Sequence, residues 1–85
     1  GRKGSDIVCA GVSALVIALI ERLDELQDEQ LVKIESFHTA DGEVALEASW
    51  EDSFGRTAAM GVFETVRTGL RRISEMYPDN VCVNN

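Results

Sequence analysis

Two side chains near the start of the chain have types and a spacing that could support chemistry. Cys9 and Ser13 interrupt a stretch from Ile7 to Ile20 that is otherwise almost entirely apolar. A spacing of four residues puts the thiol and the hydroxyl on one face of a helix, one turn apart. A thiolate is a nucleophile for acyl transfer, and a neighbouring hydroxyl can donate to it or to a substrate carbonyl oxygen. Cys9 and Ser13 are therefore our candidate catalytic residues.

The helix that carries this pair is expected to begin at Asp6, a favourable N-cap, and to end at Leu26 or Gln27. Cys9 would then lie in the first turn, where unpaired N–H groups and the helix dipole favour an anion. The Asp6 charge opposes this effect unless cap hydrogen bonds occupy the carboxylate. Each residue alone also fits a structural role, because free cysteine often packs as a small hydrophobe and helical serine bonds its own backbone.

The middle of the chain predicts a β-hairpin. Strands are expected over Gln30 to Phe37 and over Glu43 to Trp50, with Asp41-Gly42 as the turn. In the second strand apolar residues from Val44 onward alternate with more polar ones, which indicates one buried face and one solvated face.

The last part of the chain predicts a second helix and a short strand. The helix is expected from about Phe54 to Met76, with Asp52 or Ser53 as its cap, and a strand follows over Asn80 to Val83. The apolar stripe of this second helix comprises Ala59, Val62, Phe63, Val66, Leu70, Ile73 and Tyr77. Arg67, Arg71 and Arg72 are expected on the solvated side, with a role in gripping a partner as the alternative.

The resulting order of helix, strand, strand, helix, strand predicts an α+β fold. We expect one domain over residues 1–85, in which two helices pack on one face of a mainly antiparallel sheet in two layers. A sheet of three strands is small for burying the apolar faces of two helices, and the chain does not begin with methionine. We therefore expect further N-terminal strands, with this chain the C-terminal portion of a slightly longer single domain.

Composition excludes several kinds of partner and site. The formal net charge of −7 argues against direct nucleic-acid binding and suits a basic partner. Two cysteines are too few for a disulfide scaffold and lack the paired spacing of a zinc site, so we expect a reducing cytoplasm and no metal. The sequence leaves a disulfide between Cys9 and Cys82 as an alternative, although Cys82 needs no role beyond packing. The apolar run is too short to span a membrane, which takes about 20 residues.

The segment GSDIVCAGVSAL resembles the signature of the ribosomal-processing cysteine protease family. In that family a Gly–acid–apolar–apolar–Cys–Ala stretch precedes Val-Ser and an apolar helix. The residues on motif positions are Gly4, Asp6, Cys9, Ala10, Val12, Ser13 and Leu15. The order and length of the later elements also fit, so the resemblance covers essentially the whole chain, but only the first helix carries a specific motif.

The resemblance implies a cysteine endopeptidase that removes the N-terminal extension of a large-subunit ribosomal protein during ribosome assembly. It assigns Cys9 as the nucleophile and Ser13 as a helper serine. It places the base, a histidine in a Gly-His-Ala motif, upstream of Gly1, with residues 1–4 as the end of a mobile loop. It further implies a cytoplasmic homodimer that uses no metal or organic cofactor.

His38, the single histidine of the chain, is a rival for the base. A helix from Asp6 to Asp24 and a strand from Gln30 to His38 are each about 27 Å long, which would bring His38 back to the level of Cys9. The ordinary expectation is a solvated residue at the hairpin end.

The competing function is a non-catalytic acidic module that binds a ribosomal protein or an assembly factor. It needs no activated thiol and no histidine beside Cys9. A Gly-His-Ala motif in the residues before Gly1 would favour the enzyme, and the lack of any histidine there would favour the module.

Overall fold

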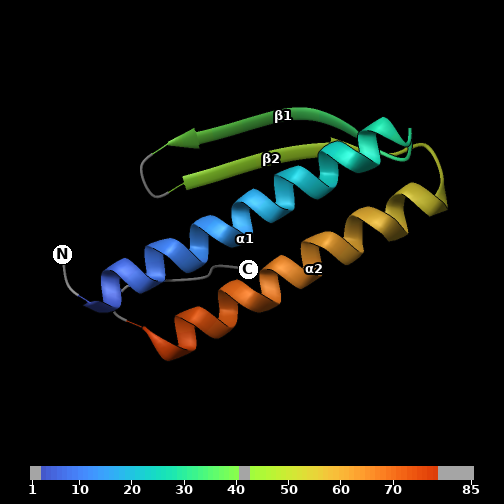
Figure 1. Ribbon diagram of the computed structural model, residues 1–85. Helices are drawn as coiled ribbons and strands as arrows, with labels where there is room; N and C mark the ends of the chain where they lie inside the picture. Colours follow the sequence, from blue (N-terminus) through green and yellow to red (C-terminus); the bar gives the residue numbers. More distant parts are fainter. Residues whose placement is uncertain (1–2, 41–42, 79–85) are drawn as a thin grey trace.

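The structure, a computed structural model, describes residues 3–40 and 43–78 and has an α+β fold. Its elements are α1 (Lys3–Asp28), β1 (Lys33–Ala40), β2 (Glu43–Ser49) and α2 (Ser53–Met76). In Figure 1, α1 runs between the hairpin and α2, and the two helices run in opposite directions. The predicted α+β class and the order helix, strand, strand, helix are confirmed. The strand predicted over residues 80–83 lies outside the described residues.

Helix α1 is longer at its start than the sequence suggests. It begins at Lys3, so Asp6 lies inside the helix, and the prediction that Asp6 is its N-cap is wrong. At the other end, Gln30 takes a φ of 64°, Leu31 N–H donates to the Leu26 carbonyl and Gln30 N–H donates to the Gln27 carbonyl, both at 2.9 Å. This pattern is a Schellman motif, which ends the helix by reversing the chain direction.

The hairpin is antiparallel, and its first strand contains a β-bulge. Strand β1 begins at Lys33, three residues after the predicted start, because the Schellman turn occupies the residues before it. Ile34 pairs with Ala48 and Ser36 pairs with Glu47, so Glu35 is the extra residue. The bulge puts Ile34 and Phe37 on the same face of the sheet, although their spacing of three breaks the strand alternation.

Helix α2 follows its sequence pattern closely. The Asp52 carboxylate caps it by accepting a hydrogen bond from Gly55 N–H at 2.9 Å. Every residue of the predicted apolar stripe is buried or half-buried, and Arg67, Arg71 and Arg72 are exposed. The stripe therefore forms the face that α2 packs against the rest of the molecule, as predicted.

The hydrophobic core lies mainly at the C-terminal half of α1. Leu23 and Leu26 are almost fully buried, and they cluster with residues of α2 and of the hairpin. The buried members of the cluster are Leu19, Leu23, Leu26, Val32, Ala59 and Val66. As a whole α1 packs more extensively against α2 than against β1. In its N-terminal half Ile7, Cys9 and Ser13 are exposed.

We expect Asp52→Ala to lower the free energy of unfolding by about 1 kcal/mol, because the first turn of α2 loses its side-chain cap. Glu51→Ala is the matched control: it removes the same charge from the adjacent exposed position and should change stability by less than about 0.5 kcal/mol. Urea unfolding followed by circular dichroism measures both. Equal losses in the two variants would contradict the assigned cap.

Candidate functional site

Cys9 and Ser13 both lie on α1, and both side chains are exposed. They are one turn apart, about 6 Å along the helix axis, as their spacing predicted. Cys9 is the seventh residue of α1, because the helix begins at Lys3. The unpaired N–H groups of a helix are its first four, and the dipole effect fades after the first turn. The predicted placement of the sulfur among the free amides at the helix start is therefore wrong.

Packing between α1 and α2 sets the rotation that turns Cys9 outward. A Cβ atom added to Gly69 of α2 would lie 3.0 Å from Leu15 Cδ1, and one added to Gly11 of α1 would lie 3.2 Å from Ile73 Cδ1. Each helix thus presents a glycine to a large side chain of the other. Val8 is 5% exposed, and Cys9 follows it by about 100° around the helix axis. Burial of Val8 therefore goes with exposure of the neighbouring thiol.

An open apolar groove of about 310 Å³ lies between α1 and β1. Val16 and Ile20 share the face of Cys9 and Ser13 at helical spacing, and Phe37 and Thr39 of β1 form the opposite side. The remaining lining residues are Ile17 and Glu21. Sequence reasoning did not predict this groove, because the β-bulge decides that Phe37 faces the helix.

His38 lies on the other face of the hairpin. It pairs with Ala45, whereas its neighbours Phe37 and Thr39 line the groove beside α1. Successive residues of a strand point to opposite faces, so the imidazole is directed away from α1. Those neighbours also lie level with Val16 to Ile20, about 10 Å or more along the helix from Cys9. Because β1 begins at Lys33 instead of Gln30, the strand does not bring His38 back to the level of Cys9. Within the described residues, His38 is therefore not placed to act as a base for Cys9.

A metal site and a membrane-spanning helix are two other features to consider among the described residues. Among residues 3–40 and 43–78, no three His, Cys, Asp or Glu side chains gather where they could hold a metal ion. No helix in that part of the chain is long and apolar enough to cross a membrane. The Arg67 and Arg72 guanidinium groups lie 3.9 Å and 3.4 Å from Glu64 and Glu75. The predicted packing of Cys82 lies outside the described residues.

The described features define an α+β domain with an exposed thiol and hydroxyl on its first helix. The family described as cysteine protease Prp matches residues 1–82, and this chain belongs to that family. The resemblance seen in the segment around Cys9 is therefore confirmed for the chain as a whole. No curated protein and no solved structure gives a significant match to it.

We expect the Cys9 thiol to react with an alkylating reagent in the folded protein, because its side chain is exposed. The measurement uses a Cys82→Ser variant, so that Cys9 is the single thiol. The rate in native protein should be within about tenfold of the rate in urea, since access does not require unfolding. Labelling that occurs only in urea would contradict the exposed position.

Proposed function

We propose that this protein is a cysteine endopeptidase that removes the N-terminal extension of a large-subunit ribosomal protein during ribosome assembly in the cytoplasm. The observation that carries the proposal is the exposed pair Cys9 and Ser13 on one stripe of α1, in a chain that belongs to the cysteine protease Prp family. Among the described residues, the Cys9 side chain is exposed, which supports direct approach of a peptide carbonyl to the sulfur.

In the proposed reaction the Cys9 thiolate attacks the scissile carbonyl carbon and forms a tetrahedral intermediate. A histidine upstream of Gly1 takes the thiol proton and returns it to the leaving amine, which leaves a thioester on Cys9. Water then cleaves the thioester and regenerates the thiol. Because Cys9 lies beyond the free amides of α1, we assign Ser13 as the hydrogen-bond donor to the oxyanion from this helix.

The charge of the chain supports a basic substrate. The net charge is −7, and acidic side chains concentrate on the C-terminal half of α1, where Glu21, Asp24, Glu25 and Asp28 are all exposed. Such a surface speeds the encounter with a basic ribosomal protein and is sensitive to salt. The same charge would also serve the non-catalytic acidic module, so cleavage itself must separate the two functions.

The decisive experiment incubates the full-length protein, including the residues upstream of Gly1, with a peptide spanning the extended ribosomal N-terminus. Cys9→Ala should lower the cleavage rate by at least about 10³-fold, because it removes the nucleophile. Cys9→Ser is the matched control for shape: it places a hydroxyl where the thiol was and should be similarly slow, because a hydroxyl is a much weaker nucleophile without its own activating base. Binding of the peptide without cleavage by any variant, wild type included, would favour the acidic module.

We expect Ser13→Ala to lower kcat by up to about 10²-fold with a small change in KM, as loss of an oxyanion donor does. His38→Ala should leave kcat unchanged within about twofold, because the imidazole is directed away from α1. Steady-state kinetics on the same peptide measure both variants. Loss of cleavage in a folded His38→Ala variant would reverse the assignment of the base.

A further inference from the structure

The turn of α1 that carries Cys9 and Ser13 is supported from behind by one residue of α2. Gly11 lies two residues after Cys9 and two before Ser13, which places it about 180° around the helix from the middle of the pair. A Cβ atom added to Gly11 would lie 3.2 Å from Ile73 Cδ1. Carbon atoms in ordinary contact are about 3.5–4.0 Å apart, so the Ile73 side chain leaves no room for a methyl group without a shift. A displacement at Gly11 in this direction moves the thiol and the hydroxyl together.

Ile73 has little freedom to move. It is half-buried near the end of α2, which lies beside the N-terminal half of α1 (Figure 1). Its carbonyl accepts a hydrogen bond from the Tyr77 N–H at 2.8 Å, which holds the final turn of the helix. A β-branched side chain in a helix also has one strongly preferred χ1 rotamer. The position of the Ile73 side chain is therefore set by α2.

The close approach of the two helices is local. One turn along from Gly11, a Cβ atom added to Gly69 would lie 3.0 Å from Leu15 Cδ1. About 18 Å along α2 from Ile73, a Cβ atom added to Gly61 would meet nothing within 4 Å. Packing tight enough to transmit a displacement is therefore present behind the Cys9 turn and absent at Gly61.

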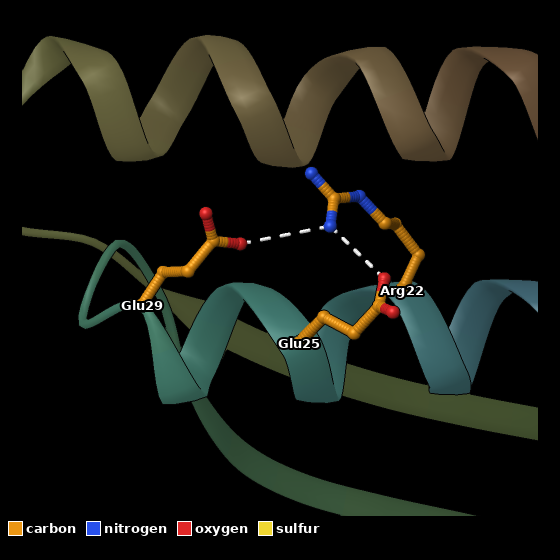
Figure 2. A network of polar contacts seen from close by, with 3 residues as sticks. All are labelled: Arg22, Glu25 and Glu29. Atoms are coloured by element: carbon orange, nitrogen blue, oxygen red, sulfur yellow. Dashed lines mark hydrogen bonds and ion pairs between the residues drawn. The ribbon is translucent and has the colours of Figure 1, made fainter.

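Gly61 instead lines an open groove of about 520 Å³ between α1 and α2. Among the described residues that line this groove, Arg22 alone is charged. Its guanidinium Nη1 lies 2.9 Å from Glu25 Oε1 and 3.6 Å from Glu29 Oε2, both also on α1 or just after it (Figure 2). The groove thus offers a place on the same helix pair where a substitution meets no packed neighbour.

We propose that Ile73 is a positioning residue for the Cys9–Ser13 pair and acts through its contact with Gly11. The catalytic consequence rests on the proposed cleavage reaction, in which the thiolate and the hydroxyl must both reach one substrate carbonyl group. A misplacement of 1 Å can cost about 10²-fold in rate, so a smaller shift should cost about tenfold. The contact also accounts for a glycine inside a helix, where alanine is ordinarily more stable.

A double-mutant cycle in the full-length protein tests the proposal. Gly11→Ala should lower kcat about tenfold and change KM by less than about twofold, because the new methyl group pushes the turn away from α2. Ile73→Val removes Cδ1, the atom that the methyl group would meet, and alone should lower kcat by up to about threefold. The double variant should recover kcat to within about threefold of the wild type. Circular dichroism checks that each variant is folded.

Two further variants separate positioning from ordinary packing. Gly61→Ala is the matched control, because it makes the same substitution in open space, and kcat should stay within about twofold. Val66→Ala removes volume from the core, where Val66 is 7% exposed, and should lower the urea midpoint while kcat stays within about twofold. A loss of kcat in Val66→Ala equal to that in Gly11→Ala would overturn the positioning role, and so would a double variant without recovery.

Backbone amide NMR resonances give a second readout that needs no cleavage. Ile73→Val should move the Cys9 and Ser13 resonances, although it lies on the other helix. Met76→Ala, at an exposed position of the same final turn, should leave them in place. A wild type that cleaves no peptide would reject the proposed function, and these resonances would then decide the positioning role by themselves. Unmoved Cys9 and Ser13 resonances in Ile73→Val would overturn it in either case.

Discussion

The arrangement of this protein depends on how closely α1 and α2 approach along their shared contact. Leu15 of α1 packs over Gly69 of α2, and Ile73 of α2 packs over Gly11 of α1. Because neither glycine has a Cβ atom, the helices fit together in one rotation, and larger side chains at these positions would force neighbours to move. That rotation buries one side of α1 and determines which of its residues meet solvent.

The most deeply buried residues of α1 and its exposed Cys9 and Ser13 are separated along the helix. Leu23 and Leu26 anchor the C-terminal half in the core, next to the residues that begin the hairpin. Cys9 and Ser13 lie about three to five turns away, in the N-terminal half, and both are exposed. A long helix can therefore supply stability at one end and an accessible thiol at the other, without a cavity inside the core.

The outer surface of the molecule is divided by charge. Carboxylates gather on the exposed side of α1 near its end, while the groove between the helices is nearly uncharged and holds its one arginine in a pair of ion contacts. Exposed ion pairs of this kind add little stability, usually less than about 1 kcal/mol. Their effect here is to lower the charge of this groove, while the carboxylates near the end of α1 stay exposed.

The sequence by itself determined the features that depend on local periodicity and capping. The apolar stripe of α2, a cap at Asp52 or Ser53 and a strand beginning at Glu43 are all recognisable because each follows from residue spacing along one element. The signature around Cys9 likewise indicated the family, since a motif of neighbouring residues needs no contact across the fold. Tertiary structure decided the rest. The Schellman turn at Gln30 delayed β1, the bulge at Glu35 turned Phe37 toward α1, and the paired register sent His38 to the opposite face. Only contacts between elements fix which side of each element is covered, so no pattern within a single element could predict these placements.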